Sequence, residues 1–212
     1  MKKTIFVIIC LFVIAACNNE PQCSGEDSDC CLPRSKWEKL SFAEVKPKAD
    51  SGDAQAQYEL AIVYALGRGV DKDMQKALEL YKKASEQGHR DAALTVSEMY
   101  LNGDVEVNEK EALKYLDKAV AKPCSGYDGI YGDSYMRAGD NKKAVPFLQK
   151  AAEENDPIAQ HSLGLMYLWG EVDGSKKPNI EEAKKWFKKA AYRGVPQAQF
   201  ALQELEKKER FK

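Results

Sequence analysis

The chain contains few residues whose types and spacing suit catalysis. His161 directly precedes Ser162, and an imidazole beside a hydroxyl is the pairing that nucleophilic catalysis uses. A lone histidine on a helix, however, is more often a packed or surface residue. The pairs Glu153-Glu154 and Glu181-Glu182 fall at the ends of expected helices, where acidic side chains are common on solvated faces. We interpret these residues as structural.

The motifs of the common hydrolases and nucleotide-binding proteins are absent from the chain. It has no HExxH, GxSxG, P-loop or GxGxxG motif, and no serine is followed three residues later by lysine. We therefore predict a protein without enzymatic activity, cofactor or bound metal.

The charges of the chain are nearly balanced. Lys and Arg number 32 and Asp and Glu number 33, for a formal net charge of −1. This balance argues against electrostatic capture of nucleic acid. The pairs Lys184-Lys185 and Lys188-Lys189 would suit an acidic partner or lipid head groups. Nearby glutamates favour a solvated helix face instead.

Residues 1–16 have the features of an export signal. Lys2 and Lys3 supply positive charge, and an uncharged apolar run extends from Ile5 to Ala16. The run is shorter than the roughly 20 apolar residues that a membrane-spanning helix needs. We expect a signal peptide and not a membrane span.

The end of this run, Ile14-Ala15-Ala16-Cys17, resembles the lipobox of bacterial lipoproteins, in which the cysteine is diacylated and becomes the first residue. The resemblance implies a lipid on Cys17 that anchors the chain to a membrane. Asn18 stands where inner-membrane retention would favour aspartate. The implied location is therefore the outer membrane of a Gram-negative cell, with the protein facing the periplasm. The alternative is an ordinary signal peptide cleaved after Ala16.

Four further thiols, at Cys23, Cys30, Cys31 and Cys124, would enter an oxidising compartment after export and are disulfide candidates. Adjacent cysteines seldom bond to each other, because the geometry is strained. We therefore expect Cys30 and Cys31 to have different partners, one being Cys23 and the other Cys124. A zinc site is the less favoured alternative, because the spacing is not CxxC and no histidine lies near in sequence.

The rest of the chain is organised by a nine-residue stretch that occurs four times. In each copy two alanines stand seven residues apart on one face of an expected helix, with a large apolar pair between them. Small residues let a neighbouring helix approach closely, and a fixed period predicts a stacked array of helix pairs. The alanine pairs are Ala77/Ala84, Ala112/Ala119, Ala144/Ala151 and Ala183/Ala190.

Glycine or asparagine stands four residues before the first alanine of most leading helices, where the preceding helix ends. These residues accept a left-handed conformation, so the same turn chemistry recurs. They are Gly52, Gly88, Asn155 and Gly194. The expected organisation is a signal peptide at 1–16, a lipidated polar tether at 17–35, a capping helix at 36–52, repeats at 53–90, 91–123, 124–155 and 156–195, and a carboxyl-terminal capping helix at 196–212.

This pattern resembles the Sel-one-like repeat family, relatives of the tetratricopeptide repeat, over roughly residues 53–208. The third repeat departs from it, with a shorter turn like that of an ordinary tetratricopeptide repeat. The resemblance implies an all-α, right-handed α-solenoid whose leading helices line a concave surface. The fourth repeat carries the motif most completely, as Ala159-Gln160, Leu163-Gly164, Tyr167, Gly170, Glu182-Ala183, Trp186-Phe187, Lys189-Ala190-Ala191 and Gly194.

Arrays of this kind suit extended contact with another polypeptide, so we expect a non-enzymatic, lipid-anchored scaffold or adaptor that binds a protein. An immunity protein that neutralises a periplasm-acting lipase or cell-wall hydrolase is the alternative. A hydrolase acting on β-lactam or cell-wall substrates is a distant third. We expect Trp169 to pack in the core, or to anchor a partner if it is exposed. The partner-binding candidates are Gln57, Glu59, Gln160, His161, Trp169, Gln197 and Gln199.

Overall fold

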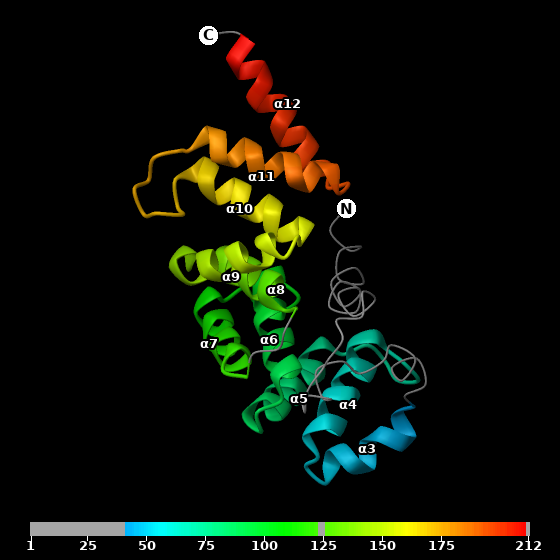
Figure 1. The fold of residues 1–212 in the computed structure, drawn as a ribbon. Helices are drawn as coiled ribbons and strands as arrows, with labels where there is room; N and C mark the ends of the chain where they lie inside the picture. The colour runs from blue at the N-terminus through cyan, green and yellow to red at the C-terminus, as the bar shows by residue number, and fades with distance from the viewer. Residues whose placement is uncertain (1–40, 123–125, 211–212) are drawn as a thin grey trace. The chain divides into compact units, whose positions relative to one another are not determined.

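The structure of the protein is a computed structural model that describes residues 41–122 and 126–210 (Figure 1). These residues form helices and contain no strand, so the predicted all-α fold is confirmed. The helices are α3 (Phe42–Asp50), α4 (Ala54–Leu66), α5 (Met74–Glu86), α6 (Arg90–Asn102), α7 (Glu109–Val120), α8 (Asp128–Arg137), α9 (Asn141–Glu153), α10 (Pro157–Trp169), α11 (Ile180–Tyr192) and α12 (Pro196–Arg210).

Several sequence-based predictions concern residues outside the described ranges. The signal peptide and the polar tether lie there, and so do Cys17, Cys23, Cys30, Cys31 and Cys124. Lipidation and disulfide pairing therefore stay predictions. None of the described helices has both the length and the apolar character that a membrane span requires.

The chain divides into two compact units, residues 1–125 and 126–212. In the first unit α4 packs against α5 and α6 packs against α7, while α5 also packs on α6. In the second unit α8 packs against α9 and α10 against α11, and α10 also contacts both α8 and α9. Each unit is thus a stack of helix pairs, in which the first member of a pair is called its leading helix below.

Short polar side chains and left-handed residues delimit the helices. The Asp73 side chain accepts hydrogen bonds from the backbone N–H groups of Gln75 and Lys76, so Asp73 is the cap of α5. Asn155 has φ 71°, a conformation uncommon for a residue with a side chain. Gly52, Gly88 and Gly194 have φ between 84° and 96°. The predicted left-handed helix ends are confirmed.

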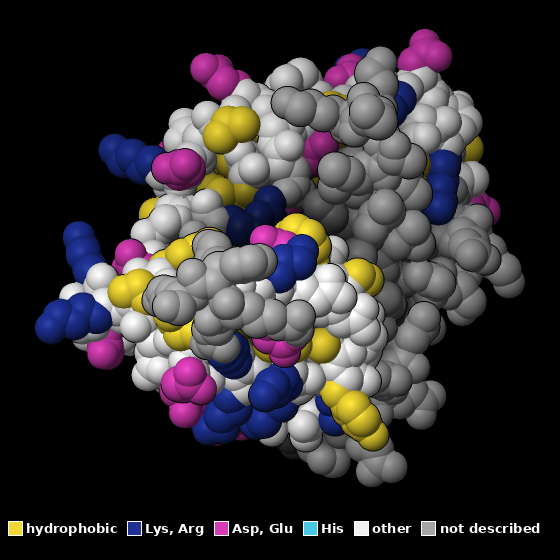
Figure 2. Space-filling view, turned by 90° about the horizontal axis from the view of Figure 1, so that it is seen from above, with side chains coloured by type: hydrophobic (Ala, Val, Ile, Leu, Met, Phe, Trp, Pro, Cys, Tyr) yellow, Lys and Arg dark blue, Asp and Glu magenta, His cyan; other side chains and the backbone are white. Residues whose placement is uncertain are grey.

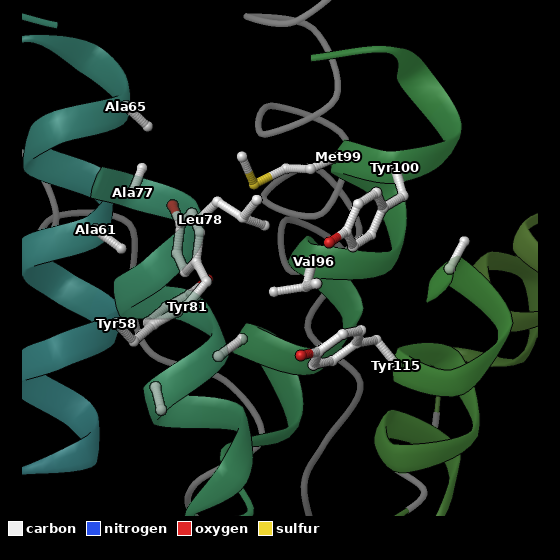
Figure 3. Packing of buried hydrophobic residues seen from close by; sticks show 13 residues of the cluster. Tyr58, Ala61, Ala65, Ala77, Leu78, Tyr81, Val96, Met99, Tyr100 and Tyr115 are labelled. Carbon is white, nitrogen blue, oxygen red and sulfur yellow. The ribbon is translucent and has the colours of Figure 1, made fainter. Parts of the chain in front are cut away.

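The repeated alanines form the packing seam between paired helices, as predicted. All eight are 3% exposed or less. The second residue of each large apolar pair is also buried; these residues are Tyr81, Leu116, Leu148 and Phe187. Figure 3 shows this packing in the first unit, where Ala61 and Ala65 of α4 face Ala77 and Tyr81 of α5. The seam residues are therefore occupied by contacts within the protein.

The described part of the predicted amino-terminal cap is helix α3, and residues 36–40 of that cap lie outside the described ranges. Helix α3 begins at Phe42, after the Ser41 side chain accepts a hydrogen bond from the Glu44 N–H. Pro47 lies inside this helix without restarting it. Val45 and Ala49 are buried in one cluster with residues of α4, which closes the apolar end of the first stack.

Candidate protein-binding surface

Each leading helix carries a row of partly exposed residues along one side. On α4 these residues are Gln55, Glu59, Ile62 and Leu66, spaced four, three and four apart. That spacing places them on one side of a helix. We call such a row the outward stripe of its helix.

A row of partly exposed residues also runs along the other leading helices; on α10, Ile158, Leu165 and Trp169 stand at the repeat positions of Gln55, Ile62 and Leu66, whereas His161 precedes Ser162, the buried counterpart of Glu59. In the first unit, α6 presents a polar stripe of Asp91, Thr95, Glu98 and Asn102. In the second unit, α8 and α10 present a more apolar surface. Its residues are Ile130, Asp133 and Arg137 on α8, and Ile158, His161, Leu165 and Trp169 on α10.

Gln57 and Gln160 do not belong to the outward stripes, so the prediction that they face outward is wrong. They are 7% and 1% exposed. The Gln160 Nε2 donates to the Ala152 carbonyl at 3.1 Å, and the Gln57 Nε2 donates to the Ala49 carbonyl at 3.4 Å. Both amides satisfy a carbonyl at the end of the preceding helix, where helices leave acceptors unpaired.

The other candidates lie at the surface, but on different parts of it. Glu59 and His161 are half-buried members of the outward stripes, whereas Gln197 and Gln199 are exposed on α12. Trp169 is 50% exposed, so the expectation that it packs in the core is wrong. His161 and Trp169 thus both lie at the surface of α10, eight residues apart.

His89 was not predicted as a site residue, yet it connects two leading helices of the first unit. Its Nδ1 accepts a hydrogen bond from the Ala92 N–H at 3.2 Å and so caps α6. Its Nε2 donates to Gln55 Oε1 at 3.0 Å, and its ring stacks on Tyr58 with centroids 4.5 Å apart. Burial lowers the pKa of His89. Its place directly after Gly88, where Asp53 follows Gly52, was the sequence signal for a cap.

The second unit has a carboxylate at the edge of its apolar stripe. Asp133 Oδ1 accepts a hydrogen bond from Ser162 Oγ at 3.3 Å, and Oδ2 lies 3.8 Å from Arg137 Nη1. Burial raises the pKa of Asp133, although Arg137 and His161 act in the opposite direction. Ser162 is buried and bonds to the aspartate, so the Ser162 hydroxyl is not placed as a nucleophile activated by His161.

Asp104 is a further carboxyl whose pKa is raised. Burial raises the pKa of Asp104 to about 6, against the lowering effect of Lys72. Asp104 lies just after Gly103, in the connection between α6 and α7, and outside the outward stripe. Across the described ranges, no group of three or more His, Cys, Asp or Glu side chains is arranged to hold a metal.

Charged side chains of both signs are interspersed on the surface, as Figure 2 shows for the described residues of one face. Most described ion pairs join residues three or four apart on one helix, for example Lys185 with Glu182 at 3.2 Å. The predicted solvated character of the lysine pairs fits this distribution, because glutamates stand among them.

The fold and the outward stripes define a helical-repeat protein with an accessible row of side chains on each leading helix. The chain belongs to the Sel1 repeat family, whose model matches residues 54–89, 91–123, 129–156 and 157–195. Proteins of this family act as scaffolds or adaptors for protein interactions. The family resemblance seen in the sequence is thereby confirmed.

Similar proteins occur in both eukaryotes and bacteria. The chain is 31% identical to the chitin synthase regulator SKT5 of Saccharomyces cerevisiae over 74% of its own length and 23% of the regulator. It is 31% identical to the ERAD-associated E3 ubiquitin-protein ligase component HRD3A of Arabidopsis thaliana, over 76% of this chain and 26% of that protein. The chain therefore spans about a quarter of the length of these relatives.

Two solved structures share the fold. A Sel1 repeat protein from Oxalobacter formigenes is 27% identical, with a TM-score of 0.60 over 77% of this chain and 68% of that chain. A protective antigen of uropathogenic Escherichia coli strains that displays an SLR fold is 30% identical, with a TM-score of 0.62 over 77% of this chain and 35% of that chain.

Proposed function

We propose that the protein is a non-enzymatic scaffold that binds another protein through the outward stripes of its leading helices. The observation that carries this proposal is the partly exposed row on each of α4, α6, α8 and α10, which falls at matching repeat positions except at His161. The seam residues of the second helices are buried by packing and leave no surface for a partner. Each repeat adds one stripe, which suits contact with an extended polypeptide surface.

The names of the relatives support a role beside another protein. One is a regulator of chitin synthase and one is a component of a ubiquitin-protein ligase. Each name describes a protein that is associated with an enzyme. We propose an equivalent adaptor role for this chain in a bacterial envelope.

We further propose that a lipid on Cys17 holds the scaffold at the outer membrane, with the repeats in the periplasm. The support is the sequence Ile14-Ala15-Ala16-Cys17 after an apolar run. A Cys17→Ser variant should leave the membrane fraction while keeping the helical signal of the wild-type protein. A variant that still sediments with membranes would contradict the anchor.

The scaffold function is tested by crosslinked pull-down of the full chain from bacterial envelopes, followed by mass spectrometry. We compare wild type with two double variants, each of which changes one glutamate and one aromatic residue. The stripe variant carries Glu59→Lys and Trp169→Ala. The control variant carries Glu79→Lys and Tyr192→Ala, on exposed positions of second helices.

Wild type and control should recover the same protein, and the stripe variant should lose it. Equal recovery by both variants, or no enriched protein with wild type, would overturn the proposal. Recovery of a single envelope hydrolase in one-to-one ratio would identify the toxin-neutralising form of the function. Recovery of several structural envelope proteins would identify the adaptor form.

A further inference from the structure

In the second unit an apolar row runs along the outward stripe of α10. Ile158 and Trp169 are 43% and 50% exposed, and Leu165 lies half-buried between them. The 11 positions from Ile158 to Trp169 correspond to about 16 Å of helix. Exposed large apolar side chains that line up in this way are typical of a contact surface for another molecule.

Asp133 of α8 places a negative charge next to this row. Its side chain is 31% exposed, and its nearest cation is the Arg137 guanidinium at 3.8 Å. The Ser162 hydroxyl donates one hydrogen bond to it at 3.3 Å. Burial raises the pKa of the Asp133 carboxyl in spite of these neighbours, so they compensate its charge only in part. A second cation would therefore stabilise the carboxylate.

His161 adds hydrogen-bonding capacity at the same place. Its ring lies 5.7 Å from that of Phe187, which packs beneath it in the core. Within the described residues the two imidazole nitrogens make no hydrogen bond. Burial lowers the pKa of His161, so the neutral ring prevails near pH 7 and offers one donor and one acceptor.

The remaining charge near Asp133 is also negative. Asp156, the cap of α10, raises the pKa of Asp133 through its charge, while Arg137 and His161 lower it. One Asp156 oxygen is committed to the backbone N–H groups of Ile158 and Ala159. The negative charge around Asp133 therefore favours a cationic ligand. It disfavours an acidic peptide or an anionic lipid surface.

We propose that the outward stripes of α8 and α10 bind a segment of a partner protein that places a lysine or arginine against Asp133 and apolar side chains on Ile158 and Trp169. The inference rests on the proposed scaffold function and defines the chemistry of the segment that it recognises. A charged contact enclosed by apolar ones is the arrangement in which few residues supply most of the binding energy. His161 would bond to the backbone or a polar side chain of the same segment.

The probe for this site is a phage-displayed library of random 12-residue peptides, selected on the full chain in detergent. The affinity of recovered peptides is then measured by fluorescence anisotropy on wild type and variants. Asp133→Asn keeps the shape and the acceptor for Ser162 but removes the charge, and Trp169→Ala removes the apolar anchor. The matched controls are Glu153→Gln and Tyr192→Ala, a carboxylate and an aromatic exposed on α9 and α11.

Recovered peptides should be enriched in a lysine or arginine with apolar neighbours. Their affinity should fall about tenfold or more with Asp133→Asn and with Trp169→Ala, and stay unchanged in the controls. Thermal unfolding of each variant checks that the fold is retained. An Asp133→Glu variant, which restores the charge, should recover part of the affinity.

Several results would overturn the inference. Recovered peptides without a basic residue would show that the site does not select a cation. Equal peptide affinities for wild type and Asp133→Asn would show the same. Peptides whose binding is lost only in a Glu59→Lys variant, in the first unit, would refute this site but leave the scaffold function intact. Self-association or binding to anionic vesicles that Trp169→Ala abolishes would assign the surface to a different occupant. A selection without any enriched peptide would count against both this site and the scaffold function.

Discussion

The ring of Phe187 fills the space next to Gly164 that a larger residue would need. A Cβ atom placed on Gly164 would lie 2.7 Å from Phe187 Cε1, closer than side chains tolerate. Gly132 and Leu148 have the same relationship in the preceding repeat, where the corresponding distance to Leu148 Cγ is 2.6 Å. In both repeats, the glycine of the leading helix thus leaves the space that the large side chain of the second helix fills.

Substitution Gly164→Ala should destabilise the second unit by up to about 2 kcal/mol. Overpacking costs about 1–3 kcal/mol, and the better helix propensity of alanine offsets about 1 kcal/mol of it. Urea unfolding followed by circular dichroism measures the change. Adding Phe187→Ala should reduce the effect of Gly164→Ala, because it removes the ring that the new Cβ atom would meet. Additive effects of the two substitutions would contradict the contact.

Substitution Gln160→Ala should cost about 1–2 kcal/mol of unfolding free energy, because the buried Ala152 carbonyl loses its donor. Gln199→Ala at the corresponding position of the next leading helix is the control. Gln199 is exposed, so its replacement should change stability by less than about 0.5 kcal/mol. Equal effects of the two substitutions on the unfolding midpoint would refute the assigned structural role.

Substitution Ala183→Glu should unfold the second unit. Ala183 is fully buried in the seam, and an unpaired carboxylate there would cost more than about 4 kcal/mol. Lys188→Glu, at an exposed position of the same helix, also adds negative charge but should leave the helical signal intact. A cooperative thermal transition of wild-type size in Ala183→Glu would show that the seam is misassigned.

The stability of the first unit should fall as the pH drops below about 6.5, the ordinary histidine pKa. His89 can cap α6 only while its Nδ1 is unprotonated, and burial lowers its pKa. The unfolded chain therefore binds the proton more readily, so stability decreases as the pH falls from 6.5 towards the folded pKa. Urea midpoints between pH 7.5 and 5 measure this decrease.

A His89→Asn variant supplies the control for that measurement. Asparagine also accepts a hydrogen bond at a helix cap but does not titrate in this range. The difference in urea midpoint between the variant and wild type should change with pH, because the other titrating groups are common to both proteins. A difference that stays constant from pH 7.5 to 5 would show that His89 does not carry the effect.

The sequence was sufficient for the fold because the same local signals occur several times. The alanines of the seam, the left-handed Asn155 and the span of α4 from Ala54 to Leu66 were each predictable from spacing and turn chemistry. A single helix would leave such signals ambiguous, whereas four copies in one register remove the ambiguity.

The binding surface was less predictable, because polarity is an imperfect guide to exposure. Gln160 was assigned to the surface for its polar type, yet its amide is long enough to reach a helix-end carbonyl from a buried position. Trp169 was expected in the core because it occupies the repeat position of Leu66. It is the last residue of α10, at the same place as Leu66, which is 37% exposed at the end of α4. Whether such a terminal position is covered depends on the following connection, which sequence periodicity does not describe.

Site-specific photo-crosslinking in living cells tests the central claim most directly. A photoreactive amino acid is placed at Glu59, Glu98, His161 or Trp169 on the outward stripes. Matched positions are Glu79 and Lys188, exposed on second helices. We predict that the stripe positions yield a discrete crosslinked protein and that the second-helix positions do not. Crosslinks to the same protein from Glu79 and Lys188, with none from the stripes, would contradict recognition by the leading helices.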